Sequence, residues 1–166
     1  MLTIQKKSLR VGRYVSTKDA DTIIRTYKQE RWVHNSEHLG KEDSLSVWYT
    51  IEELEEFLSR SKAHGGDGIK FYFSAYPKNY EERPEYAGRQ TILLVATKTA
   101  ESETGVVNKD IYTKGEEGVT ILAYNSGSLC PPMCGDPRPP KPVDADDWGM
   151  VGVTIVDRGK KGLTVV

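Results

Sequence analysis

The sequence predicts an α+β fold in a single domain covering residues 1–166, with two helices packed on a mostly antiparallel sheet of about five or six strands. Two stretches in the first half of the chain repeat their apolar residues with helical spacing. Several later stretches are short and either alternating or apolar throughout, and the connections between them carry no helix. We therefore expect mostly antiparallel pairing.

The first helix is predicted to begin near Lys18, because Ser16 and Thr17 are residue types that cap helices. The apolar residues that follow lie on one helical stripe: Ala20, Ile23, Ile24 and Tyr27. This pattern fades near Arg31.

The second helix has more local signals. Thr50 is a favourable N-cap, and Glu53 lies three residues later, as a capping box requires. Gly65 and Gly66 can adopt the left-handed conformation that ends many helices. Residues 47–49, just before the helix, favour a short strand. The buried stripe is predicted to consist of Ile51, Leu54, Phe57 and Leu58.

Residues 69–76 alternate in polarity and predict a half-buried strand, which Pro77 ends. The side expected to face the core carries Ile69, Phe71, Phe73 and Ala75. The opposite side carries Lys70, Tyr72, Ser74 and Tyr76. Residues 90–98 predict a central strand, residues 119–124 a further strand, and residues 151–166 a C-terminal hairpin.

Three segments are predicted to lie outside the regular structure. Residues 78–88 and residues 100–118 are polar and read as exposed loops. Residues 130–147 contain six prolines, so we expect a proline-rich surface excursion with extended backbone. The acidic residues at its end favour a solvated turn over a weak calcium site: Asp144, Asp146 and Asp147.

Charge and hydropathy argue against two kinds of partner. The formal net charge is −1, from 23 basic and 24 acidic residues, so the basic surface that nucleic acids require is not expected. The longest aliphatic run, residues 92–96, is far shorter than the ~20 residues of a membrane-spanning helix. With no export signal and two cysteines, the sequence predicts a cytoplasmic protein.

The middle of the chain resembles a group of small uncharacterised bacterial proteins, mainly from the Bacteroidetes. The resemblance lies in residues 46–54, in the Gly-Ile-Lys-Phe-Tyr-Phe run of residues 68–73, and in the Ala-Tyr-Pro of residues 75–77. It extends over residues 15–98. Since no activity is established for that group, the resemblance supports the helix and strand predictions and implies no catalytic residue.

A first candidate site is a metal centre. His34, Glu37 and His38 match the His-x-x-Glu-His signature of inverted zincins. On a helix the two histidines would share a face and could hold zinc, with the glutamate as base. Such an enzyme would need a third ligand, for which Glu116 or Glu117 could serve.

Other features of this segment weaken the metal hypothesis. Asn35 and Ser36 are poor residues inside a helix, and Gly40 should end it, which favours a solvated helix end.

Cys130 and Cys134 have zinc-ligand spacing and could complete a Cys2His2 set with the histidine pair. We favour reduced structural cysteines, and leave a metal or a disulfide open.

A second candidate is the aromatic face of the strand at residues 69–76. Tyrosine combines an apolar ring with a polar hydroxyl, which suits interfaces and ligand pockets. The alternative is that a helix or the proline-rich segment covers this face. The candidate binding residues are Trp48, Lys70, Tyr72 and Tyr76.

Together these patterns favour a non-enzymatic binding domain that uses the aromatic strand face and the proline-rich segment to contact a protein or a small molecule. Catalysis stays open, but the Gly-x-Ser-x-Gly, Walker and Rossmann signatures are all missing and no catalytic residue is assigned. No cofactor is expected, although zinc is possible. The alternative function is a zinc-binding protein or small zinc hydrolase built on the histidine pair, with Glu37 or the cysteines.

Overall fold

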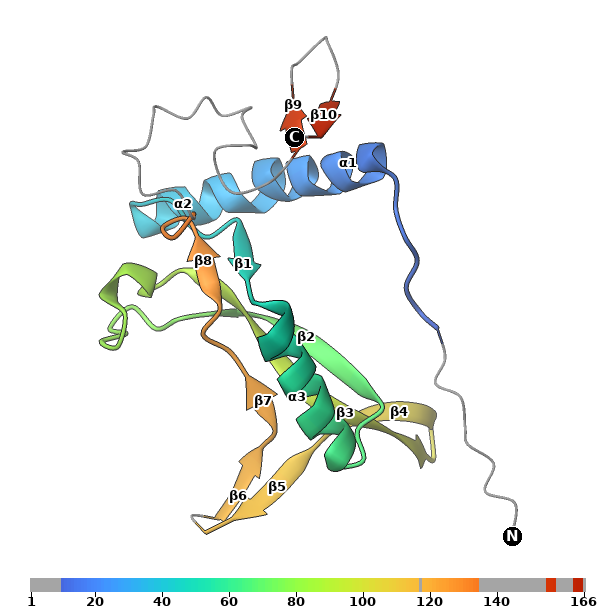
Figure 1. Cartoon of the computed structure of the whole chain (residues 1–166). Helices are drawn as coiled ribbons and strands as arrows, with labels where there is room; N and C mark the ends of the chain where they lie inside the picture. Colours follow the sequence, from blue (N-terminus) through green and yellow to red (C-terminus); the bar gives the residue numbers. More distant parts are fainter. Residues whose placement is uncertain (1–9, 117, 135–154, 158–162, 166) are drawn as a thin grey trace, which may run out of the picture.

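The computed structural model describes residues 10–116, 118–134, 155–157 and 163–165 (Figure 1). Helices in the first half are followed by strands, and every strand pair in these ranges is antiparallel. The predicted α+β class and the antiparallel pairing are therefore confirmed. Most of the proline-rich segment, including Asp144, Asp146 and Asp147, lies outside the described residues.

The N-terminal helix extends beyond its apolar stripe. Ser16 caps α1 (Thr17–Tyr27), which passes through a π-helical turn at Lys28–Trp32 into α2 (Val33–Leu39). Figure 1 shows these segments as one continuous rod. The helix ends only at Gly40, which has a left-handed φ of +67°. The helix therefore continues past Arg31, where its apolar pattern fades, and ends at Gly40, as predicted.

Contacts with distant residues explain why the helix continues after its apolar stripe has ended. The Tyr27 hydroxyl donates to Gln90 Oε1 at 2.7 Å, and Trp32 Nε1 donates to the Asp43 carbonyl at 2.8 Å. Asn35 Nδ2 donates to Asp43 Oδ2 at 3.1 Å. These polar contacts outweigh the low intrinsic helix propensity of Asn35, because propensity differences are well below the cost of losing such bonds.

The second predicted helix is α3 (Ile51–Ala63), and it begins with the predicted capping box. Thr50 Oγ1 accepts from the Glu53 N–H at 3.1 Å, and Glu53 Oε2 accepts from the Thr50 N–H at 2.8 Å. Phe57 is buried as expected, but Ile51 and Leu58 are exposed, so the predicted buried stripe is wrong at these two positions. The short strand before the helix is β1 (Ser46–Trp48).

The main sheet has the order β2-β3-β4, formed by β2 (Gly68–Ala75), β3 (Gln90–Ser102) and β4 (Gly105–Asp110). β7 (Ala123–Tyr124) also pairs with β3, on the side away from β2. The register sets Phe71 opposite Leu94 and Phe73 opposite Ile92. Strand β2 is therefore an edge of this sheet (Figure 1).

Residues 100–118 do not form the single exposed loop that their polarity predicted. They contain the end of β3, all of β4 and the first strand of a hairpin, β5 (Tyr112–Gly115) with β6 (Gly118–Ile121). Most side chains of β5 and β6 are exposed. A strand exposed on both faces lacks the apolar alternation from which a strand is recognised.

Three chain segments meet where β4 passes into this hairpin. The N–H of Ala96 donates to the carbonyl of Leu122 at 3.0 Å, and the N–H of Leu122 donates to the carbonyl of Ile111 at 2.8 Å. The N–H of Ile111 donates in turn to the carbonyl of Ala96 at 2.9 Å. These bonds close a ring of main-chain contacts, which we call the junction. The main buried cluster lies beside it: Phe57, Leu94, Ala96 and Leu122.

Two further strand pairs complete the described structure. β8 (Ser128–Cys130) pairs with β1, and β9 (Ile155–Asp157) pairs with β10 (Leu163–Val165), as predicted for the C-terminal hairpin. Between β2 and β3 the predicted loop includes a 3-10 turn at Pro84–Tyr86. Among the described residues, no helix has the length and apolar character needed to cross a membrane.

Candidate functional site

The outer edge of β2 presents main-chain hydrogen-bonding groups to solvent. Ala96 directs both its N–H and its carbonyl to Leu122 and Ile111, away from β2, and the Tyr76 N–H donates to the Arg89 carbonyl at 3.0 Å. The main-chain N–H and carbonyl groups of successive residues in a strand point to opposite neighbours. Those of the even-numbered residues of β2 therefore bond to β3, and those of the odd-numbered residues point away from the sheet. The outward-pointing residues are Ile69, Phe71, Phe73 and Ala75.

The two phenylalanines of this edge are exposed, and the prediction that they face the core is wrong. Phe71 is 59% exposed and Phe73 is 86% exposed. They lie on the sheet side that α3 covers, because their β3 partners Leu94 and Ile92 pack in or against the cluster around Phe57. The helix covers the inner strand and leaves most of the edge strand open, so alternation alone could not reveal which apolar residues are buried.

On the opposite side of β2, Lys70 and Tyr72 share one carboxylate. Lys70 Nζ lies 2.6 Å from Asp110 Oδ1, and the Tyr72 hydroxyl donates to Asp110 Oδ2 at 3.0 Å. The bond from Lys70 holds the pKa of Asp110 below its ordinary value, and the same bond raises the pKa of Lys70. The charge on β2 is therefore neutralised within the chain.

From these contacts we predict that the effect of Asp110→Asn on the stability of the fold depends on pH. A depressed carboxylate pKa stabilises the fold above the unfolded-state value of about 4, and this contribution is lost as the pH falls through the folded-state pKa. We expect the variant to be less stable than wild type at neutral pH and the difference to shrink below about pH 4. Urea unfolding at a series of pH values measures it, and a pH-independent difference would contradict the assignment. High salt should also reduce the difference, since the pair is partly exposed.

The other two predicted binding residues have different surroundings. The Tyr76 hydroxyl donates to Asn125 Oδ1, and its ring stacks on Tyr80 with centroids 4.5 Å apart. Tyr76 is half-buried and contributes to packing rather than to an open face. Trp48 is 64% exposed on β1, and no contact among the described residues joins it to the Lys70 cluster. The structure thus brings together only Lys70 and Tyr72 of the four.

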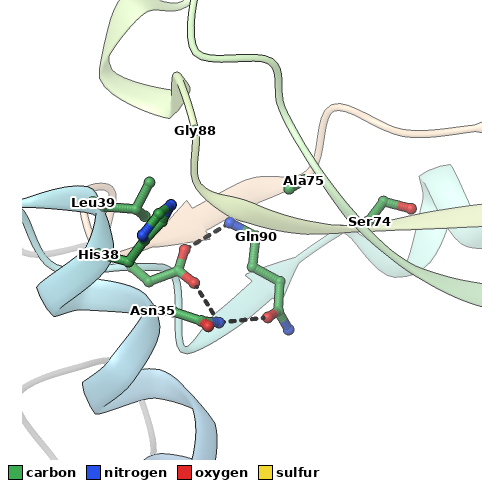
Figure 2. A pocket seen from close by; sticks show the side chains of 8 residues that line it. Asn35, His38, Leu39, Ser74, Ala75, Gly88 and Gln90 are labelled. Atoms are coloured by element: carbon green, nitrogen blue, oxygen red, sulfur yellow. Dashed lines mark hydrogen bonds between the residues drawn. The ribbon is translucent and has the colours of Figure 1, made fainter.

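A pocket of about 190 Å³ lies between the end of α2 and the start of β3. Figure 2 shows Asn35 and His38 projecting from α2 toward Gln90. The carboxylate of Asp43, only 2% exposed, accepts from the Gln90 N–H at 2.6 Å, from the Ser44 N–H at 2.7 Å and from Asn35 Nδ2. The remaining lining residues are Leu39, Ser74, Ala75 and Gly88. Asn35, Asp43 and Gln90 bind one another, which indicates a structural network.

Arg89 lies next to this pocket, between Gly88 and Gln90. It is buried, and its Nε donates to the Glu85 carbonyl at 2.8 Å. Burial lowers the pKa of its guanidinium, while Asp43 and Glu42 act in the opposite direction. Nη1 has no hydrogen-bond partner among the described residues. A lone arginine inside a polar loop carries no sequence pattern that would have marked it.

No protein-family model, curated protein or solved structure matches this chain. The resemblance to the Bacteroidetes group therefore stays an expectation.

The histidine signature lies on a helix as predicted. His34 Nδ1 is 3.8 Å from Glu37 Oε2, and both side chains are largely exposed. His38 lines the pocket. Over the described ranges, no three side chains of His, Cys, Asp or Glu come close enough together to hold a metal ion. Glu116 is exposed near the end of β5, and Glu117 lies outside the described residues.

The two cysteines form a disulfide, Cys130 to Cys134, so the expectation of reduced thiols is wrong. In this state neither sulfur is a thiolate that could bind zinc with His34 or His38. The disulfide closes a short loop at the end of β8. At the same place the Leu45 N–H donates to the Cys130 carbonyl at 2.7 Å. Because disulfides are rare in cytosolic proteins, the bond counts against the cytoplasmic location expected from the sequence.

Proposed function

We propose that the chain is a non-enzymatic interaction domain that binds an extended protein segment along the outer edge of β2. One observation carries this proposal: the outward main-chain groups of β2 lie beside two largely exposed phenylalanines, Phe71 and Phe73. Proteins usually shorten, charge, bulge or cover such an edge, because an uncovered one pairs readily with another strand.

An added strand would gain two kinds of contact. Its main chain would pair with the outward N–H and carbonyl groups, which gives affinity with little dependence on sequence. Its side chains would contact Phe71 and Phe73 on one side of the sheet and Tyr72 on the other. Aromatic side chains supply large contact areas and are enriched in interface cores, so they would provide the selectivity.

The charge of the edge indicates the chemistry of the bound segment. Lys70 is the only charged residue between Gly68 and Ala75, and Asp110 already neutralises it. An acidic or basic segment would therefore find no free countercharge on β2 itself. We expect a neutral segment rich in β-branched or aromatic residues, of the length of β2.

Selection of displayed random peptides against the immobilised chain tests this proposal, followed by titration of each selected peptide in solution. We expect Phe71→Ser with Phe73→Ser to weaken peptide binding by roughly tenfold or more, since truncation of central aromatic anchors commonly costs this much. The matched control, Val106→Ser with Val119→Ser, removes exposed apolar side chains on β4 and β6 and should leave binding unchanged.

The main-chain part of the proposal has its own readout. Methylation of alternate amide nitrogens in a selected peptide removes donors on one side only, so one methylated pattern should abolish binding and the other should not. Peptides that bind wild type and the Phe71/Phe73 variant equally well would overturn the proposal. So would a selection that yields no peptide whose binding depends on either phenylalanine.

A further inference from the structure

We infer that the segment that pairs with β2 is β2 of a second copy of this chain, antiparallel about a two-fold axis at Tyr72. This inference rests on the proposed function and names its partner. A two-fold axis makes each strand meet its own copy, so the edge must be complementary to itself in main-chain direction, in shape and in charge. The edge of β2 meets all three requirements.

The main-chain directions fit this register. With Tyr72 opposite Tyr72 of the second copy, Phe71 lies opposite Phe73 of that copy, and Ile69 opposite Ala75. All four are odd-numbered residues, whose N–H and carbonyl groups point outward from the sheet. Residues paired in this way exchange both hydrogen bonds, and the pair on the axis falls at a position without hydrogen bonds, as antiparallel geometry requires.

The side chains on the α3 side of the sheet fit the same register. Phe71 of each copy would face Phe73 of the other, so four phenylalanines would form one apolar cluster continuous with Ile69 and the core. Cross-strand aromatic pairs are among the favourable pairs in antiparallel sheets. Shifting the register by two residues in either direction keeps the same main-chain groups facing each other, but it pairs Phe73 with Ile69 or Phe71 with Ala75 of the second copy. These side-chain pairs are less favourable than Phe71 with Phe73.

Charge favours a second copy over a charged partner. In this register Lys70 lies opposite Ser74 of the second copy, so no like charges meet across the interface. Each Lys70 stays bound to Asp110 of its own chain at 2.6 Å. The two tyrosine rings at the axis lie on the same side of the sheet, where each hydroxyl is held by Asp110.

Sedimentation equilibrium of the full chain over a wide concentration range tests the dimer. Wild type should show a monomer–dimer equilibrium, and Phe71→Lys with Phe73→Lys should raise the dissociation constant by roughly tenfold or more. Phe71→Glu with Phe73→Glu should do the same alone, and the two variants should dimerise when mixed, because each lysine then faces a glutamate. Val106→Lys with Val119→Lys is the control and should dimerise as wild type does.

Single cysteines test the register while Cys130 and Cys134 stay bonded to each other. In the proposed register the two Cα atoms of residue 72 are about 4.5 Å apart, within the range a disulfide spans. The two copies of residue 74 are roughly 14 Å apart, since four residues of strand separate them. Under oxidation Tyr72→Cys should therefore form a cross-linked dimer and Ser74→Cys should not.

These outcomes separate this inference from the proposed function. A chain that stays monomeric while its edge still binds selected peptides overturns the dimer and leaves the proposed function standing. A dimer that persists in the Phe71→Lys, Phe73→Lys variant overturns the inference, because its interface would lie elsewhere. Efficient cross-linking of Ser74→Cys, without that of Tyr72→Cys, overturns the register and with it the inference.

Discussion

Replacing Asp43 with alanine should lower the free energy of unfolding by about 3 kcal/mol, because a buried acceptor of several hydrogen bonds is lost. The N–H groups of Gln90 and Ser44 both donate to Oδ1, at 2.6 and 2.7 Å. Without the carboxylate these donors stay buried and unpaired, at about 1–3 kcal/mol each before relaxation. Urea unfolding followed by tryptophan fluorescence measures the change, because Trp32 bonds to the same residue.

Two variants serve as controls for this experiment. Glu42→Ala removes an exposed carboxylate next in the chain, and its effect should stay within about 0.5 kcal/mol. Asp43→Asn keeps one oxygen but presents an amide donor to Asn35, so we expect an intermediate loss. Equal stability of Asp43→Ala and Glu42→Ala would contradict the assigned role of Asp43.

Replacing Tyr86 with alanine should cost about 4 kcal/mol, since truncation of a fully buried aromatic side chain commonly costs 3–5 kcal/mol. Tyr86 is 0% exposed. Its ring packs 5.7 Å from the ring of Tyr76, centroid to centroid, and its hydroxyl accepts from the Leu129 N–H at 3.2 Å. The side chain thus joins the loop after β2 to β8. Thermal and urea unfolding of the variant measure the loss.

A second substitution at the same position separates the ring from the hydroxyl. Tyr86→Phe keeps the packing but removes the acceptor, so it should cost about 1–2 kcal/mol and speed hydrogen exchange at the Leu129 amide. Tyr112→Ala, at an exposed tyrosine on β5, should be nearly neutral. If Tyr86→Phe costs as much as Tyr86→Ala, then ring burial is not the main contribution.

Local chemistry made part of the fold predictable. The capping box of Thr50 and Glu53 involves residues three apart, so the start of α3 could be read directly from the sequence. The alternation of residues 69–76 likewise predicted strand β2. The faces of β2 could not be assigned correctly, because burial depends on which strand ends the sheet. That order is set by pairings between distant residues, such as Phe71 with Leu94.

The same distinction holds for the candidate site. Lys70 and Tyr72 are predictable because the polar face of a strand is visible in the local sequence, whereas their partner Asp110 lies about forty residues away and carries no pattern. The sequence predicts Phe71 and Phe73 in the core, because apolar residues are usually buried. The sequence does carry one signal of their exposure, which is the presence of large aromatic residues on both sides of one strand. A single helix covers only one side of a sheet, so some of these residues must be exposed. The network around Asp43 left no signal in sequence, since it joins three separate segments.

The ring of main-chain bonds at Ala96, Ile111 and Leu122 also determines where the chain tolerates a change in length. The two ends of the β5–β6 hairpin are fixed to each other and to β3, with the Leu122 N–H donating to the Ile111 carbonyl. Residues inserted between Gly115 and Gly118 therefore need not shift the register of β3, and the entropic cost of a longer loop grows slowly. The tip of this hairpin is a graft position for an affinity sequence or a fluorescent reporter, on a different strand pair from the β2 edge.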